Sequence, residues 1–130
     1  MVIFMDIEIK TSSPEPVYKQ IVRQISEAVQ TGGLKGGYSL PPVRQLAGDL
    51  MLNPNTVAKA YKQLEQMRVV RGAGRAGTFV EENAAVHIAQ NNSVSAKFEL
   101  DSLLKSFVDR GIPGPEVRIL LFDSIEKLRG

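Results

Sequence analysis

Apolar side chains recur every three or four residues in five stretches of the chain, which is the spacing of one buried face of an α-helix. The stretches lie at residues 17–29, 43–50, 57–67, 100–108 and 117–128. Breaker residues bound the first stretch, because Pro16 precedes it and two glycines follow it. We therefore expect a mainly helical chain whose first helix runs from about Pro16 to about Thr31.

The third stretch has two faces of different chemistry. Asn53 suits its N-cap, because the side-chain oxygen accepts from a first-turn amide, and Pro54 suits the first helical position. Tyr61 lies in the apolar stripe, so we expect it in the core rather than stacked on a base. The polar face carries side chains that hydrogen-bond readily to phosphates or base edges: Asn55, Thr56, Lys59, Lys62 and Gln63.

The second stretch spans only about two helical turns, and a helix of that length is not stable without a packed neighbour. Only Met51, Leu52 and Asn53 separate it from the third stretch. A short helix, a tight turn and a second amphipathic helix are typical of a helix-turn-helix.

Two β-forming segments, 69–70 and 78–80, flank a loop that holds three glycines and two arginines, Arg71 and Arg75. This arrangement predicts a β-hairpin with a flexible cationic tip. Farther upstream, residues 5–10 alternate between apolar and polar side chains, which predicts a short strand.

The C-terminal region begins with an acidic pair and contains a polar run at 90–93, which we expect to interrupt helical structure. Residues 84–89 are then either one helical turn or a linker. Two helices in a tail of this length cannot bury both apolar stripes against each other. We favour pairing with the same hairpin of a second chain as a four-helix bundle, and a helical cap on one monomer is the alternative. The expected dimerisation residues are Leu100, Leu103, Leu104, Phe107, Leu120, Leu121, Ile125 and Leu128.

The composition narrows the chemistry. The chain has no cysteine and one histidine, His87, so disulfides, thiolate zinc sites and cysteine nucleophiles are excluded. We expect His87 at a surface or an interface, and we expect no metal and no cofactor. Phosphate-loop, Gly-x-Ser-x-Gly and His-Glu-x-x-His motifs are absent, which disfavours an enzyme. No apolar run is long enough to span a membrane, so we expect a cytoplasmic protein without membrane partners.

The positive charge is concentrated around the second and third stretches. The chain has a net charge of only +2, but residues 35–75 carry seven basic side chains against two acidic ones, a net charge of +5. A local basic patch on a nearly neutral chain is typical of a surface that binds a polyanion. A solvated charged surface is the alternative that composition leaves open.

Five motifs occur in one order: Leu40–Ala47 as LPPVRQLA, Asn53–Val57 as NPNTV, then Lys-Ala-Tyr, Leu-Glu, and Gly77–Val80 as GTFV. In this order they resemble the GntR family of bacterial transcription regulators, strongly over residues 15–80. The NPNTV motif followed by Lys-Ala-Tyr is similar to the YtrA-like branch, which has a very short C-terminal region.

The resemblance implies a mainly α fold with a small β-hairpin wing: a winged helix-turn-helix domain at 1–80 and a short helical dimerisation region at 81–130. It further implies a homodimer that binds a two-fold symmetric double-stranded DNA operator and regulates transcription, with ABC transporter genes as expected targets. We expect a repressor, although no residue distinguishes repression from activation. The expected DNA-binding residues are Arg44, Asn53, Asn55, Thr56, Lys59, Lys62, Arg71, Arg75, Gly77 and Thr78.

Four features depart from the family pattern, and one is the wing, where two residues separate Gly74 from Gly77 although Gly-x-Gly is common. Pro42 replaces a serine of many members, and Pro54 and Ala58 stand where other branches carry arginine. Lys59 and Lys62 supply charge instead, but lysine lacks the bidentate fork with which arginine binds guanine. A winged-helix protein-interaction module without sequence-specific DNA binding stays the alternative function. A small-molecule effector between subunits and no effector at all both stay open.

Overall fold

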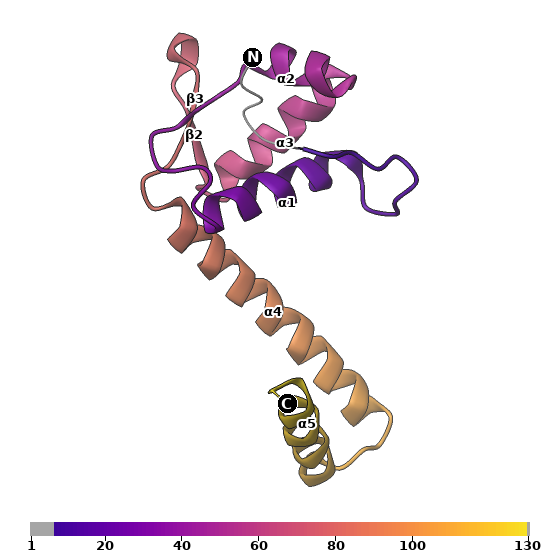
Figure 1. Ribbon diagram of the computed structural model, residues 1–130. Coiled ribbons are helices and arrows are strands. Elements are labelled where there is room, and N and C mark those ends of the chain that lie inside the picture. Colours follow the sequence, from indigo (N-terminus) through magenta and orange to yellow (C-terminus); the bar gives the residue numbers. More distant parts are fainter. Residues whose placement is uncertain (1–6, 130) are drawn as a thin grey trace. The chain divides into compact units, whose positions relative to one another are not determined.

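Helices dominate the computed structural model, which describes residues 7–129 (Figure 1). The helices are α1 (Val17–Gln30), α2 (Val43–Leu50), α3 (Pro54–Gln66), α4 (Ala84–Asp109) and α5 (Gly114–Arg129). The strands are β1 (Ser39–Leu40), β2 (Val70–Gly72) and β3 (Thr78–Val80), and a 3-10 turn, η1 (Gly74–Ala76), joins β2 to β3. The contacts divide the chain into two units, one up to Asn91 and one from Asn92, while α4 continues across the boundary.

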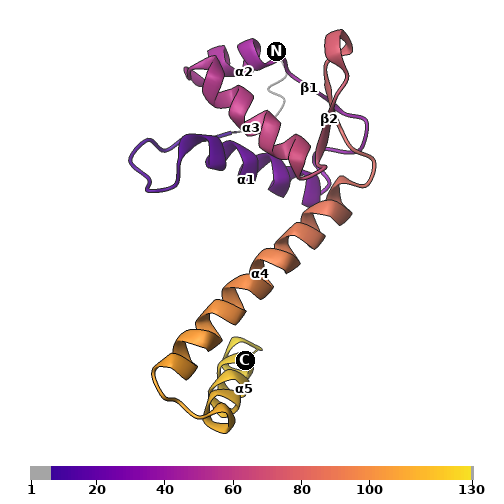
Figure 2. The same cartoon turned by 180° about the vertical axis from the view of Figure 1, so that it is seen from behind.

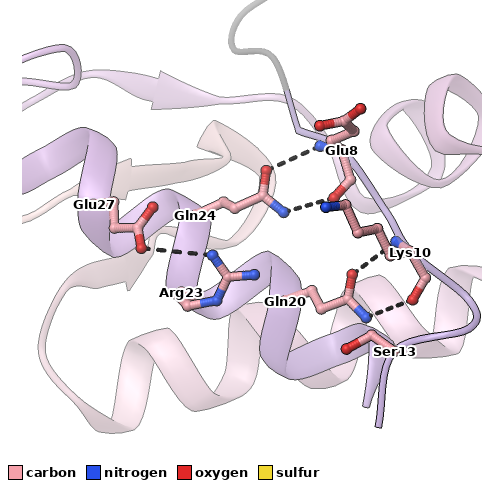
Figure 3. Close-up of a pocket in the computed structure, with 7 residues that line it drawn as sticks. All are labelled: Glu8, Lys10, Ser13, Gln20, Arg23, Gln24 and Glu27. Carbon is pink, nitrogen blue, oxygen red and sulfur yellow. Dashed lines mark hydrogen bonds and ion pairs between the residues drawn. The ribbon is translucent and has the colours of Figure 1, made fainter. Parts of the chain in front are cut away.

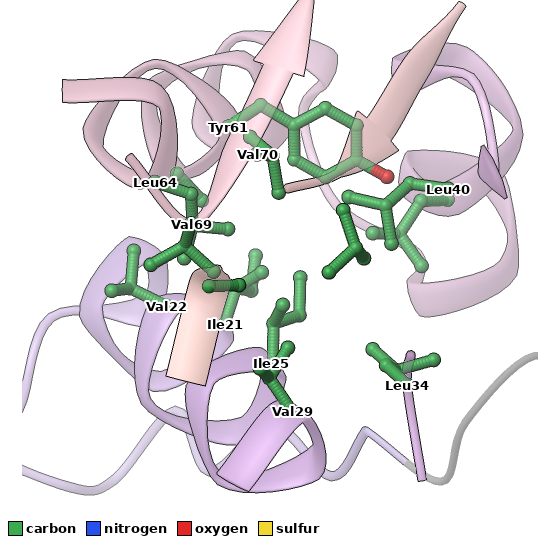
Figure 4. Packing of buried hydrophobic residues seen from close by; sticks show 14 of the residues in the cluster. Ile21, Val22, Ile25, Val29, Leu34, Leu40, Tyr61, Leu64, Val69 and Val70 are labelled. Carbon is green, nitrogen blue, oxygen red and sulfur yellow. The ribbon is translucent and has the colours of Figure 1, made fainter. Parts of the chain in front are cut away.

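The core of the first unit is built around α3, which packs against both α1 and α2 (Figures 1 and 2). The predicted apolar faces are the ones that are buried: Ile21 and Ile25 of α1 and Leu64 of α3 are fully enclosed (Figure 4). Each such side chain contributes roughly 1.5–3 kcal/mol when it leaves water. Ala84 and Ile88 of the first α4 turns join the same cluster.

The sheet is small and antiparallel, with β3 in the middle of the order β1-β3-β2. Val70 lies opposite Val80 and Gly72 opposite Thr78, while Ser39 lies opposite Phe79. The β2–β3 pair confirms the predicted hairpin. The strand β1 was not predicted, because two residues give no alternation from which to recognise a strand.

The predicted strand at 5–10 is wrong for residues 7–10, and residues 5 and 6 lie outside the described range. Residues 7–10 have no neighbouring strand, and two side-chain amides of α1 pair with their backbone instead (Figure 3). Gln24 accepts from the amide of Glu8 at 2.9 Å and donates to its carbonyl at 2.8 Å. Gln20 does the same for Lys10, at 2.9 Å in both directions. The alternating residues 7–10 therefore form a segment whose backbone bonds to side chains of α1, and not to a neighbouring strand.

The predicted interruption at 90–93 is also wrong, because α4 is helical from Ala84 to Asp109. Glutamine, asparagine and serine lower helix propensity by less than about 0.7 kcal/mol per residue, unlike proline. Asn91 also donates to the carbonyl of Met67, at 3.1 Å, and so ties this turn to the end of α3.

The second unit contains the rest of α4 and α5, the two helices predicted for the tail. Val117 is buried, and Leu104, Phe107 and Leu121 are half-buried. The other predicted dimerisation residues are exposed by 40–88% in the single chain: Leu100, Leu103, Leu120, Ile125 and Leu128. Five further apolar side chains are also exposed: Val94, Phe98, Val108, Ile119 and Phe122.

Two glycines allow a test of backbone packing in the first unit. A Cβ added at Gly36 would lie 2.8 Å from the Cα of Glu82, so one of the two backbone segments would have to move. We expect Gly36→Ala to lower the free energy of unfolding by about 1–3 kcal/mol, which is the usual cost of overpacking. Urea denaturation at one protein concentration measures this change.

Gly48→Ala is the matched control, because the helix α2 leaves open space around Gly48. Alanine there should raise the free energy of unfolding by roughly 0.5–1 kcal/mol. If both variants change stability by the same amount and sign, the close approach at Gly36 does not constrain the fold.

Candidate nucleic-acid interface

The turn between α2 and α3 sets the start of the polar helix. Met51 ends α2 in the left-handed region, with φ 57°, and the amide of Leu52 then bonds the carbonyl of Ala47 at 2.8 Å. Asn53 caps α3 as predicted, since its Oδ1 accepts from the amide of Asn55 at 2.8 Å. Pro54 occupies the first helical position, where no N–H is needed.

The predicted polar face of α3 is exposed, opposite to its buried face. Val57, Ala60 and Leu64 are fully enclosed. Half a turn away, four exposed side chains follow one another at intervals of three or four residues: Asn55, Lys59, Lys62 and Gln66. We call these four residues the polar row. Thr56 and Gln63 are half-buried at its edge. The sequence-based list omitted Gln66, although the helical spacing already included it.

Tyr61 links α3 to the residues that lead into α2. Its side chain is 6% exposed, and its hydroxyl donates to the carbonyl of Pro41 at 2.7 Å. Burial raises the pKa of Tyr61, so the hydroxyl stays protonated and remains a donor. The core assignment of Tyr61 is confirmed. The bond fixes the entry of α2, where the second residue is the exposed Arg44.

Pro42 stands at the N-cap position of α2, and no side chain caps this helix. The hydroxyl that a serine would supply here is therefore missing, as the sequence indicated. The exposed Arg44 therefore lies in the first turn of a helix that no side chain caps.

The wing differs from its prediction in the first strand, which covers Val70–Gly72 rather than residues 69–70. Arg71 lies in β2 rather than in the tip, because the strand pairing extends as far as Gly72 and Thr78. The tip is the 3-10 turn with the exposed Arg75. Gly74 and Gly77 have φ values of 57° and 113°, which few residues other than glycine adopt easily.

Two of the predicted DNA-binding cations lie over aromatic rings. The Nζ of Lys59 is 4.1 Å from the ring centroid of Tyr18, in the first turn of α1. The guanidinium carbon of Arg71 is 5.0 Å from the ring centroid of Phe79, its partner across the strands. Neither ring was predicted to be part of the site. Tyr18 and Lys59 are far apart in the chain, and only the packing of α1 on α3 brings them together.

The predicted DNA-binding residues all belong to the first unit. Both views place α2, the N-terminal end of α3 and the wing tip at the same end of that unit (Figures 1 and 2). Arg44, the start of the polar row and Arg75 are carried by these three elements. Within residues 7–129, no helix is both long and apolar enough to cross a bilayer.

Comparison with known proteins gives a consistent result. Residues 17–80 match the family described as "Bacterial regulatory proteins, gntR family". Over 114 residues the chain is 36% identical to the HTH-type transcriptional repressor YtrA of Bacillus subtilis. This alignment covers 88% of this chain and 85% of that protein.

Two solved structures extend the likeness to the fold. A transcriptional regulator from Oenococcus oeni has a TM-score of 0.68 and 32% identity, over 90% of this chain and 97% of that one. YtrA from Sulfolobus acidocaldarius, described as a GntR-family transcription factor, has a TM-score of 0.57 and 33% identity. That match covers 69% of this chain and 95% of the other.

The cap of α3 can be tested separately from any contact with DNA. Asn53→Ala should lower the free energy of unfolding by about 0.5–2 kcal/mol, because it removes the acceptor for a first-turn amide. Asn53→Ser should keep most of the stability, since serine also caps. Thermal and urea unfolding measure both variants.

Asn55→Ala is the control within the same helix turn, because the side chain of Asn55 is exposed and caps nothing. Its unfolding free energy should be that of the wild type or slightly higher. An equal loss in Asn53→Ala and Asn55→Ala would contradict the capping role.

Proposed function

The chain belongs to the gntR family of bacterial regulatory proteins, and on that premise we propose that it represses transcription as a homodimer on a two-fold symmetric DNA operator. The predicted family, the mainly helical winged fold and the assignment to DNA-binding regulators rather than enzymes are thereby confirmed. The roles of individual residues, the dimer and the symmetry of the operator are the proposal.

The polar row carries this proposal. A helix with its side chains is about 10–12 Å wide, and the major groove is about 12 Å wide, so the exposed face of α3 fits it. The amide of Asn55 has the donor and acceptor pair that binds adenine, while Lys59 and Lys62 offer charge to phosphates or guanine. The opposite face of α3 is fully used in the core, so only this face is free for a ligand.

The other predicted residues surround the helix. Asn53 uses its oxygen for the cap, which leaves its NH₂ group to donate to a phosphate. Arg44 approaches the backbone or a guanine edge from α2. Arg75 at the wing tip suits the negative potential of a narrow minor groove. Gly77 and Thr78 hold the wing backbone close to the DNA, as the family resemblance implies.

The tail supports the proposed dimer. Its two helices leave most of their apolar residues in water in the single chain, including Leu103, 51% exposed, and Leu128, 88% exposed. Apolar surface of this extent on a helical hairpin favours burial against another apolar surface. Two such hairpins form a four-helix bundle, which presents two copies of α3 to one duplex. Half-sites about 10–10.5 base pairs apart, one helical turn, then fit the dimer.

The proposal extends to the target genes. The resemblance to the YtrA-like branch leads us to expect an operator upstream of ABC transporter genes. Selection of bound sequences from random duplex DNA, followed by a search for the selected site beside such genes, tests this expectation without any assumption about an effector.

The proposed contacts with phosphates predict a strong dependence of DNA binding on salt. If a dimer neutralises about six phosphates, the logarithm of the association constant should fall with the logarithm of salt concentration with a slope of roughly −5. Fluorescence anisotropy with the selected duplex between low and moderate salt measures the slope. A slope near zero, or equal affinity for selected and random duplexes, would favour the protein-interaction alternative.

Arg44→Ala tests the role of one residue in the same binding measurement. It should weaken binding of the selected duplex by about 1–3 kcal/mol if Arg44 contacts a base. Lys127→Ala is the matched control, because Lys127 lies in the tail and pairs with Asp123 at 3.0 Å. Equal effects of the two substitutions would remove Arg44 from the interface.

The proposed dimer can be tested by a charge placed in its interface. Leu103→Glu places a charge in the proposed bundle and should raise the dimer dissociation constant by about 100-fold, which is typical of an unpaired charge in a buried interface. Sedimentation at micromolar concentration measures the change. Ser102→Glu adds the same charge on the other side of α4, where Ser102 is exposed, and should leave the dimer intact. A wild-type chain that sediments as a monomer would support the helical cap on one monomer.

A further inference from the structure

Tyr18 stands beside the polar row although it belongs to another helix. Tyr18 packs against the core cluster, and the Nζ of Lys59 lies over its ring, 4.1 Å from the centroid. Tyr18 is half-buried and Lys59 is exposed, so the pair sits where the core meets the solvent. A lysine within about 6 Å of an aromatic centroid is attracted by the negative face of the ring.

We propose that Tyr18 is a positioning residue for DNA binding, which holds the ammonium group of Lys59 at the α1 side of the polar row, ready for a phosphate. The inference rests on the proposed function and names a residue outside α3 that contributes to it. Tyr18 acts through Lys59 and needs no contact of its own with the DNA.

A ring partner leaves the charge and the N–H donors of Lys59 available for a phosphate. A carboxylate partner would also hold Lys59, but it would cancel the charge and occupy N–H donors that a phosphate requires. A ring face attracts the cation without accepting a conventional hydrogen bond, so the donors of the ammonium group stay available. Lysine has a long, mobile side chain, and restricting it before binding lowers the entropy cost of the phosphate contact.

A second cation in the first unit also lies over an aromatic ring. Arg71 lies over Phe79 in the wing, and within residues 7–129 neither Arg71 nor Lys59 forms an ion pair. The polar row supplies the contrast, because Lys62 is also an exposed lysine but has no ring contact in the described part of the chain. Lys62 is therefore the internal control for Lys59.

A purely structural role for Tyr18 predicts a different result from a positioning role. If Tyr18 only fills the edge of the core, its replacement disturbs the domain whatever side chain occupies position 59. If it positions Lys59, its replacement matters only while the lysine is present. A double-mutant cycle measured on DNA affinity separates the two cases.

The experiment measures binding of the selected duplex by wild type, Tyr18→Leu, Tyr18→Phe, Lys59→Met and the Tyr18→Leu/Lys59→Met double variant. We expect Tyr18→Leu to weaken binding about two- to fivefold at low salt, the effect of an exposed cation–π pair. Tyr18→Phe keeps the ring and should keep the affinity. In the Lys59→Met background Tyr18→Leu should have no further effect, whereas in a Lys62→Met background its effect should persist.

Several results would overturn the inference. These are an unchanged affinity in Tyr18→Leu, the same loss with and without Lys59, or a loss in Tyr18→Phe equal to that in Tyr18→Leu. If the wild type binds its duplex, such results leave the proposed function standing. A wild type that binds no duplex overturns the proposed function and the inference together.

A measurement on the wild type guards against variants that fail to fold. A proton above an aromatic ring resonates upfield, so the ε-methylene protons of Lys59 should lie upfield of those of Lys62 in the NMR spectrum. The difference should persist when the selected duplex is added. Loss of the upfield position on binding would show that DNA removes Lys59 from the ring, and that result also overturns the inference.

Discussion

The burial of one face of α3 between α1 and α2 is the constraint on which the first unit depends. Val57, Ala60 and Leu64 are completely enclosed, so the rotation of the helix about its axis has a single solution. Because side chains in a helix project with a period of 3.6 residues, fixing the apolar face also fixes where the polar row points. The surface proposed for DNA is thus a direct consequence of core packing.

The two units differ in how far they bury the apolar faces of their helices. The first encloses its apolar faces within one chain, with help from the first turns of α4, where Ala84 and Ile88 are buried. In the second unit, Val117 is the one buried side chain among the described residues, and it is still 9% exposed. A hairpin that leaves its stripe in water gains little stability by itself, since burial of apolar area is the main favourable contribution to folding. In the proposed dimer a second hairpin supplies that burial, and the two-fold symmetry of the proposed operator would follow from the symmetry of such a pair.

Helical spacing and caps allowed most of the fold to be predicted, because these are local properties of the sequence. The cap by Asn53, the core position of Tyr61 and the wing hairpin all depend on neighbours within a few residues. The interruption at 90–93 was a local error, because polar residues lower helix propensity only slightly. The other errors arose where distant groups decide the outcome. Residues 7–10 alternate like a strand but are held by Gln20 and Gln24, and the ring under Lys59 comes from another helix. Of the predicted site, the positions of the side chains could be foreseen, but their partners could not.

The positions of the ion pairs also bear on the proposed DNA-binding surface. In the described part of the chain, every ion pair involves a cation outside the predicted DNA-binding set: Arg23, Lys97, Lys105, Lys127 and Arg129. Exposed ion pairs add little to stability, so leaving the cations of the proposed interface without acidic partners costs the fold almost nothing. The same omission matters for DNA, because an acidic neighbour would repel the phosphates and would have to be displaced. Aromatic rings contact Lys59 and Arg71 without that penalty, so these two cations can be positioned and still keep their full charge.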